Sequence, residues 1–126
     1  MRETDFTRMV CQSWIKRGWT VVVNQAGVTV SNIPDRTLIC PLGMIYIEFK
    51  GVKTGIRVGQ KVWMERANRS LAYASIVVRW NGEGVTIQKP DGTVLMKLDI
   101  EPHKNGVDAV VLAEALFRIQ KGARRG

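Results

Sequence analysis

The central segment of the chain, residues 35–50, constrains the fold more than any other, because it reads as two strands joined by a tight turn. Arg36 to Pro41 and Met44 to Phe49 are apolar runs of strand length, and Pro41-Leu42-Gly43 has the composition of a turn. We therefore predict a β-hairpin. Side chains two apart on a strand share a face, so one face of this hairpin is apolar and the other carries charged residues.

The charged face brings together an aspartate, a glutamate and a lysine. Glu48 and Lys50 point to the same side, and Phe49 points to the apolar side. If Leu42-Gly43 is a two-residue loop, Asp35 lies opposite Lys50, and Glu48 is its diagonal neighbour, roughly 7 Å away between backbone positions. A three-residue loop would shift the pairing by one residue and turn Asp35 to the other face.

Two carboxylates at this distance can share a hard divalent cation. Mg²⁺ prefers oxygen ligands and keeps several of its waters, and a bound ion lowers the pKa of such a water and polarises a phosphate. The ammonium of Lys50 could hold the attacking water or neutralise charge that develops on the phosphate. The trio indicates metal-dependent hydrolysis of phosphodiester bonds. The alternative is structural: Asp35 begins a turn, and Glu48 and Lys50 form a surface ion pair.

The order and spacing of these residues resemble the PD-(D/E)xK nuclease superfamily, most closely its VRR-NUC and Holliday junction resolvase-like group. Four elements carry the resemblance: Glu3 opening a predicted helix, Ile33-Pro34-Asp35 before a strand, Ile47-Glu48-Phe49-Lys50 ending the next strand, and Gln60-Lys61 opening a second helix. They span about half of the chain. Asn32-Ile33 replaces the familiar glycine before Pro-Asp, and Arg36 stands where an apolar residue is usual.

The resemblance implies a fold, a cofactor and a set of site residues. The implied fold is α/β, a single restriction-endonuclease-like domain whose mixed central sheet is flanked by helices, here with an additional C-terminal hairpin and helix. The implied cofactor is Mg²⁺, with Mn²⁺ as a substitute. The implied metal ligands are Asp35, Glu48, Glu3 and the backbone carbonyl of Phe49. Lys50 is implied as the catalytic residue, supported by Gln60 and Glu3, in an enzyme of DNA recombination and repair.

Periodicity and turn residues predict the remaining elements. We expect helices over Glu3 to Arg17 and Arg57 to Leu71, strands over Trp19 to Asn24 and Tyr73 to Trp80, a looser extension over Gln25 to Asn32, and a loop beside the site over Lys50 to Gly59. Val85 to Lys89 and Thr93 to Leu98 flank Pro90-Asp91-Gly92 and predict a second hairpin. The second helix should face the core with Val58, Val62, Ala67 and Leu71.

The C-terminal region predicts a last helix capped by Asp108. Its broad apolar face comprises Val110, Val111, Ala113, Leu116, Phe117 and Ile119. Core packing is favoured for this face, and a dimer surface is the alternative. A chain of 126 residues with 45% hydrophobic content can bury one sizeable core, so we expect a single domain over residues 1–120 and a disordered basic tail over 121–126.

The net charge of +8 favours an anionic partner, with nucleic acid as the first candidate. Arg36, Lys53, Arg57 and Lys61 could form a phosphate-binding rim near the site. A membrane partner is not expected, because no segment approaches the roughly 20 apolar residues of a span. A nucleotide cofactor is not expected either, since the glycine-rich residues 55–61 lack phosphate-loop spacing. Two isolated cysteines and no visible signal peptide predict a cytoplasmic protein. The resemblance implies that it is bacterial or phage-encoded.

The sequence thus predicts a magnesium-dependent endonuclease that cuts branched DNA such as Holliday junctions as a homodimer. Two alternatives stay open: a nuclease acting on flap, nicked or ordinary duplex DNA, and a non-catalytic basic nucleic-acid-binding domain that keeps a vestigial site.

Overall fold

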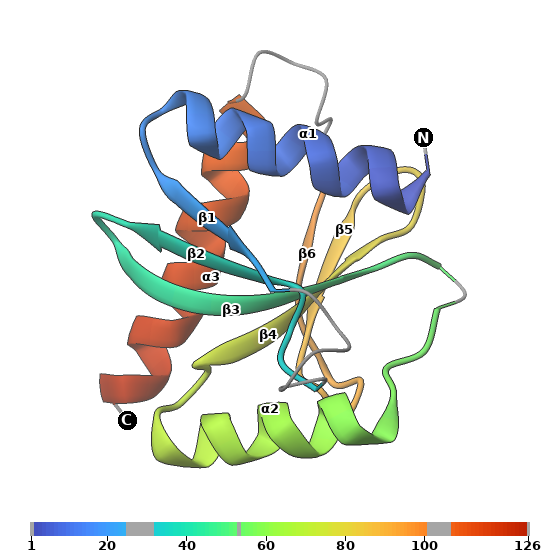
Figure 1. The fold of residues 1–126 in the computed structure, drawn as a ribbon, viewed down its shortest axis with the longest axis vertical. Coiled ribbons are helices and arrows are strands. Elements are labelled where there is room, and N and C mark those ends of the chain that lie inside the picture. Colours follow the sequence, from blue (N-terminus) through green and yellow to red (C-terminus); the bar gives the residue numbers. More distant parts are fainter. Residues whose placement is uncertain (1, 25–31, 53, 101–106, 126) are drawn as a thin grey trace.

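A mixed six-stranded sheet forms the centre of the molecule, with helices on both of its faces (Figure 1). The computed structural model describes residues 2–24, 32–52, 54–100 and 107–125. The strands lie side by side in chain order, and each neighbouring pair is antiparallel except β3 and β4. The elements are α1 (Glu3–Lys16), β1 (Thr20–Val23), β2 (Arg36–Cys40), β3 (Gly43–Lys50), α2 (Val58–Ser70), β4 (Ser75–Trp80), β5 (Val85–Gln88), β6 (Val94–Leu98) and α3 (Val107–Arg125).

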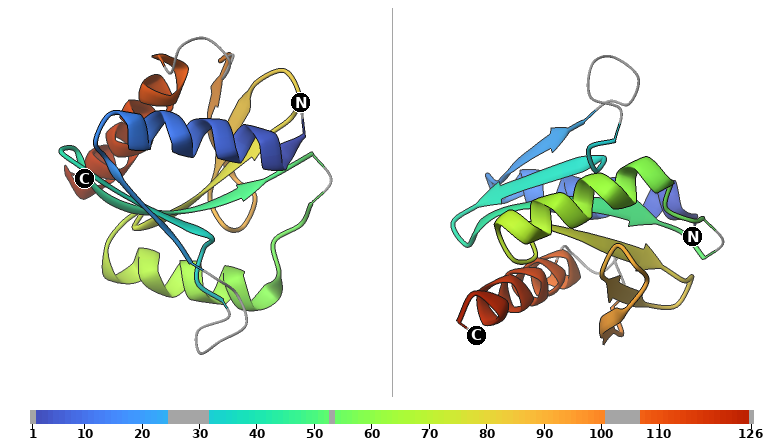
Figure 2. Two further views of the ribbon diagram at one scale, coloured as in Figure 1. Left: turned by 45° about the horizontal axis from the view of Figure 1, so that its top comes forward. Right: turned by 90° about the horizontal axis from the view of Figure 1, so that it is seen from below.

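The main apolar core lies between the sheet and the helices α1 and α3, and α2 covers the opposite face (Figure 2). Helix α2 connects the two parallel strands, as a crossover must. On the other side, Phe6 of α1 stacks on Trp80 with ring centroids 4.8 Å apart. The indole Nε1 of Trp14 donates a 2.7 Å hydrogen bond to the carbonyl of Ala109, which ties α1 to α3.

The predicted order of helices and strands is confirmed, and the bounds differ by a few residues at most for the described elements. Helix α1 ends one residue earlier than expected, and Gly18 adopts the left-handed φ of +84° that the C-terminal position of a helix favours. The second hairpin turns at Gly92 with φ +94°. Most of the expected extension over 25–32 lies outside the described residues.

Helix α2 packs on the sheet with a different face from the one its apolar residues predicted. The predicted stripe consists of Val58, Val62, Ala67 and Leu71. Three of these side chains are at least 42% exposed, whereas Gln60 is 4% and Met64 0% exposed. The prediction is wrong because polar contacts orient the helix: the Asn68 side chain accepts from the backbone N–H of Ser75 at 2.8 Å and donates to its carbonyl at 3.0 Å.

Helix α3 uses most of its apolar face in the core. The buried apolar side chains that it contributes are Ala109, Leu112, Ala113, Ala115, Leu116 and Phe117, while Val111 is 40% exposed. The structure agrees with core packing as the main use of this face. The helix begins at Val107, so Asp108 lies in its first turn rather than at the cap. It runs on to Arg125, over residues that we expected to form a disordered tail.

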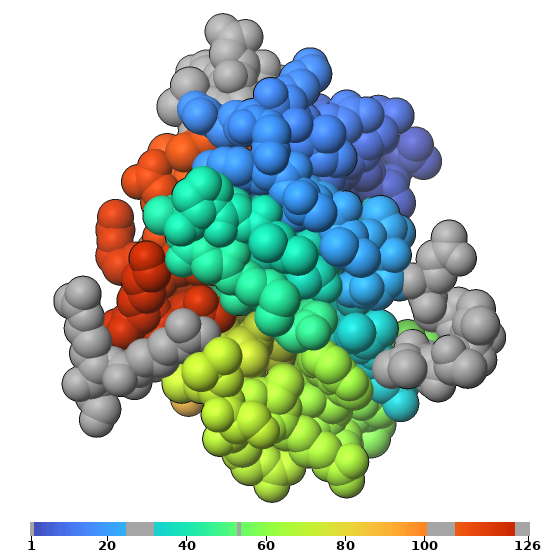
Figure 3. Space-filling view, turned by 60° about the vertical axis from the view of Figure 1, so that its left-hand side comes forward, coloured from blue at the N-terminus to red at the C-terminus, as the bar shows by residue number. Residues whose placement is uncertain are grey.

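The β2–β3 hairpin reaches the surface between α1 and α2 (Figure 3). Its outer face carries Ile39 and Met44, which are 43% and 47% exposed, and the neighbouring edge strand adds Val22 at 40%. This end of the sheet therefore presents apolar side chains that no helix covers. Among the described residues, no helix combines the length and the apolar character needed to cross a bilayer.

Candidate active site

The β2–β3 turn decides how the two acidic residues face each other. The strands pair Cys40 with Gly43 and Arg36 with Ile47, so the two-residue loop is Pro41-Leu42 and not Leu42-Gly43. Gly43 belongs to β3 with φ +140°, and a Cβ there would lie 3.2 Å from the Phe117 ring. Only glycine therefore fits this position without strain.

The predicted pairing of Asp35 with Lys50 is consequently wrong by two residues. Continued by one residue beyond β2, the observed register puts Asp35 directly beside Glu48. A slip of two keeps every side chain on its predicted face, because the strand period is two. The two carboxylates are thus closer neighbours than the sequence predicted.

Hydrogen bonds lock the two acidic residues together. The backbone N–H of Asp35 donates to Oε1 of Glu48 at 2.9 Å, and the N–H of Phe49 donates to Oδ1 of Asp35 at 3.3 Å. Nζ of Lys50 lies 3.2 Å from the other carboxylate oxygen of Glu48, Oε2, in a largely buried ion pair. The structure therefore brings the aspartate, the glutamate and the lysine together at the ends of β2 and β3.

The electrostatics of this cluster favour a bound positive charge. Burial and, to a smaller extent, the nearby Glu48 carboxylate raise the pKa of Asp35 to about 7, against the lowering effects of Arg36, the hydrogen bond from the Phe49 N–H, and Lys50. A carboxylic acid with such a pKa holds a proton over part of the neutral range. A cation between the two carboxylates would favour the ionised form of both, so the donor set suits a hard divalent metal ion.

Gln60 adds an oxygen that has no partner. It lies in the first turn of α2, is 4% exposed, and its Oε1 accepts no hydrogen bond from the described residues. A buried amide oxygen without a donor is costly, and it usually indicates a missing water, ion or ligand. The amide oxygen of Gln60 is therefore available to a water or a ligand.

Glu3 lies at the end of β3, but the structure does not place it in a three-acid cluster. Its side chain packs against Gly51, the residue after Lys50, where an added Cβ would lie 3.3 Å from Cβ of Glu3 and 3.6 Å from its Oε2. No group of three or more His, Cys, Asp or Glu side chains that could hold a metal ion occurs among the described residues. Two carboxylates thus form the centre of the cluster, with Glu3 to one side.

Two of the four rim cations lie near Gln60. Arg57 is the residue before α2, and Lys61 is in its first turn, 3.9 Å from Glu65. Arg36 lies differently: paired with the buried Ile47, it points to the α1 side of the sheet and donates to the carbonyl of Asp35 at 3.0 Å. Lys53 lies outside the described residues.

Arg36 also approaches Cys11 of α1 from this side. Burial raises the pKa of the Cys11 thiol to about 11, although the guanidinium of Arg36 opposes that effect. Cys11 and Cys40 are both free, as the sequence predicts. Of the rim cations among the described residues, Arg57 and Lys61 therefore lie at the start of α2, whereas Arg36 contacts the α1 side of the sheet.

The sequence and the structure were compared with those of known proteins. No protein-family model matches the sequence, and no curated protein does. Among solved structures, the chain is similar to Hjc, a Holliday junction resolvase from the hyperthermophilic archaeon Archaeoglobus fulgidus. The identity is 17% and the TM-score 0.54, with 90% of this chain and 98% of that chain covered. This domain has the fold of that resolvase. The likeness confirms the expected restriction-endonuclease-like fold, a mixed sheet flanked by helices.

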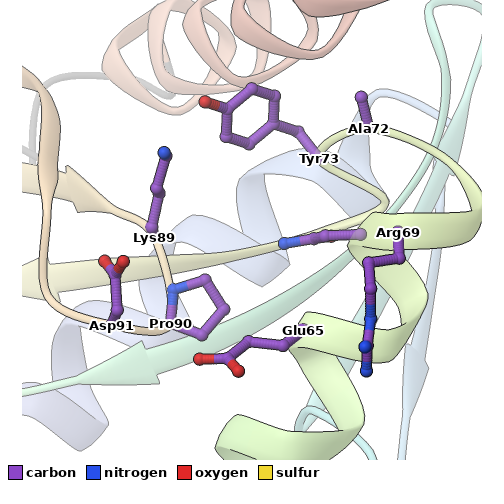
Figure 4. A pocket seen from close by; sticks show the side chains of 8 residues that line it. Glu65, Arg69, Ala72, Tyr73, Lys89, Pro90 and Asp91 are labelled. Carbon is purple, nitrogen blue, oxygen red and sulfur yellow. The ribbon is translucent and has the colours of Figure 1, made fainter.

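The cluster is separate from a cavity of about 500 Å³ at the other end of α2 (Figure 4). That cavity is lined by Glu65, Asn68, Arg69, Ala72, Tyr73, Lys89, Pro90 and Asp91. None of the predicted site residues lines it, and its two acidic and two basic side chains balance in charge. Of the acidic pair, Asp35 is partly exposed and Glu48 is buried.

Sequence reasoning assigned no role to Arg79. Arg79 lies inside the apolar strand β4, beside Lys50 in the parallel ladder, and donates hydrogen bonds to Gly51, Thr54 and Gln88. A charge within an apolar strand is a signal in itself, because arginine is rarely buried without a specific partner.

Proposed function

We propose that the chain is a metal-dependent endonuclease that hydrolyses phosphodiester bonds in branched DNA such as Holliday junctions. The observation that carries the proposal is the direct pairing of Asp35 with Glu48, with the ammonium of Lys50 3.2 Å from Glu48. The likeness of the fold to an archaeal Holliday junction resolvase supports the choice of substrate. Within the PD-(D/E)xK superfamily, we infer a place in the VRR-NUC and resolvase-like group.

The residues fit a magnesium ion, with Mn²⁺ as a substitute. Asp35, Glu48 and the backbone carbonyl of Phe49 would hold it, with Glu3 as a further carboxylate, all of them the hard oxygen donors that Mg²⁺ prefers. When bound, such an ion supplies a water of lowered pKa and polarises the phosphate. The raised pKa of Asp35 supports this fit, because burial and the Glu48 carboxylate disfavour its ionised form and a bound cation would favour that form.

The protein's own groups would orient the reactants. Glu48 holds the Lys50 ammonium in a fixed position, from which it can donate to the attacking water or to a phosphate oxygen that gains charge. Oε1 of Gln60 can accept a hydrogen from that water and so direct its lone pair. Most of Glu48 and Lys50 is shielded from solvent, which strengthens these interactions.

DNA would approach along the start of α2. We propose that Arg57, Lys61 and Lys53 bind backbone phosphates, which positions the strand without reading its sequence. Recognition by branch shape would need two active sites, so we propose a homodimer that works in the cytoplasm of a bacterium or phage-infected host. The exposed apolar end of the sheet around Ile39 and Met44 offers surface for a second subunit.

A cleavage assay tests the proposal. Purified protein would be mixed with four-way junction, flap and duplex DNA in Mg²⁺, in Mn²⁺ and in chelator. We expect cutting of the junction in either metal and none in chelator, and Glu48→Ala and Lys50→Ala should abolish cutting while largely sparing binding. Preferred cutting of flap or duplex DNA would change the substrate. Cutting in chelator, or full activity in both variants, would contradict the proposed site, and binding without cutting would identify a non-catalytic domain.

A further inference from the structure

Arg79 is the charged residue of the otherwise mostly apolar strand β4. It pairs with Lys50 in the parallel ladder, so the two side chains share the sheet face that carries Glu48. A guanidinium that is partly removed from water needs hydrogen-bond acceptors for its five N–H groups. Among the described residues, no carboxylate lies within ion-pair distance of Arg79. Its donors go to neutral oxygens instead.

Two of those oxygens belong to the segment that follows Lys50. Nη1 donates to the backbone carbonyls of Gly51 and Thr54, the latter at 2.8 Å. Nε donates to Oε1 of Gln88 on β5 at 3.2 Å, which orients the guanidinium plane. One side chain thus joins β4 and β5 to the connection that runs from Lys50 to α2.

This connection adjoins three of the proposed site groups. It starts directly after Lys50, Gly51 packs against Glu3, and its other end leads into the turn of α2 that carries Gln60. Its described part has neither helix nor strand before Val58, and it contains Gly51 and Gly55. Side-chain hydrogen bonds to its carbonyls are therefore a major constraint on its path.

We propose that Arg79 is a positioning residue of the active site: by binding the carbonyls of Gly51 and Thr54, it sets the spacing between Lys50, Glu3 and Gln60. This inference rests on the proposed nuclease function. The planar fork of arginine suits two carbonyls and one amide oxygen at once, and a lysine ammonium cannot reproduce that geometry. Arg79 itself touches neither metal nor substrate.

Kinetics of Arg79→Ala and Arg79→Lys test the role in catalysis. We expect kcat to fall by about tenfold or more, since small misplacements of reacting groups are costly, while KM for DNA changes little. The Mg²⁺ concentration for half-maximal activity should rise severalfold, and added methylguanidine should partly restore Arg79→Ala. Gln88→Ala should shift the same quantities less. The control is Arg17→Ala, which removes an exposed cation at the far end of α1 and should behave as wild type.

A second readout needs no cleavage of DNA. In chelator, trypsin should cut Arg79→Ala after Lys53 and Arg57 severalfold faster than wild type, with the melting temperature little changed. If Arg79→Ala does not fold, Gln88→Ala should show the same faster proteolysis. Wild-type kcat and metal dependence in Arg79→Ala, or unchanged proteolysis of this segment, would overturn the inference. If the wild type cuts no substrate, the proposed function fails, and the proteolysis rates alone decide whether Arg79 holds the segment.

Discussion

Replacing Asp35 with asparagine should make the metal-free protein more stable while it removes the proposed activity. Asp35 has a pKa raised to about 7 by burial and by the Glu48 carboxylate. The pKa of Asp35 is higher in the folded than in the unfolded protein. The contribution of its protonation to folding stability is therefore fully present below pH 3.8, the pKa in the unfolded chain, and is lost as the pH rises through about 7. An asparagine keeps the oxygen that accepts from the N–H of Phe49 but carries no charge.

The size of the effect follows from the two pKa values. Each tenfold change in proton affinity is worth about 1.4 kcal/mol, so the rise from 3.8 to about 7 sets an upper limit of about 4 kcal/mol at pH 8. Partial solvent access and relaxation around Asp35 reduce this, and we expect a gain of about 2 kcal/mol. For a chain of this length, that gain raises the melting temperature by roughly 8 °C.

The assay is thermal and urea denaturation of wild type and Asp35→Asn in chelator at pH 5 and pH 8. The gain should be less than half as large at pH 5, where folded Asp35 is protonated. Asp99→Asn is the matched control, because that exposed aspartate should change stability by less than about 0.5 kcal/mol. Mg²⁺ should stabilise only the wild type. Equal stability of Asp35→Asn and wild type at pH 8, or the same gain at both pH values, would refute the reasoning.

Three further predictions concern residues outside the proposed site. Gln120→Leu should lower the free energy of unfolding, measured by urea denaturation, by about 2 kcal/mol. The buried Gln120 amide donates to the carbonyls of Met44 and Tyr73, and both carbonyls would lose their donor. Tyr73→Gly should leave the free energy of unfolding unchanged or raise it by up to about 1 kcal/mol, because Tyr73 has a φ of +53° that glycine adopts without strain. Iodoacetamide should label Cys11 slowly at pH 8 in native protein and rapidly in urea, since burial raises its thiol pKa to about 11.

Alternation along β3 was enough to predict which side chains share the charged face. Glu48 and Lys50 lie together and Phe49 lies in the core, as a strand period of two requires. The second hairpin and the end of α1 were also predictable, since Gly92 and Gly18 both take the left-handed φ that their positions favour. These features depend only on neighbours in the sequence.

The face of α2 was not predictable from its own residues. The apolar pattern of Val58 and Val62 indicates one face, but the helix buries Gln60 and bonds Asn68 to the start of β4. A hydrophobic stripe predicts burial only where a helix packs on an apolar surface. The surface under α2 carries Glu48 and Lys50, so a polar face of the helix matches it better.

The β2–β3 register explains why the sequence predicted that Asp35 and Glu48 share a face, although the predicted strand pairing was wrong by two residues. Pro41-Leu42-Gly43 allows two different two-residue loops, and the choice depends on Gly43, whose φ of +140° and contact with Phe117 of the distant α3 are not local properties. The two loops differ by two residues in pairing, and such a slip leaves Asp35 on the same face as Glu48. It changes only the separation: the observed loop makes the two carboxylates direct neighbours. Burial and the charge of Glu48 together raise the pKa of Asp35, which strengthens the case for a cation there.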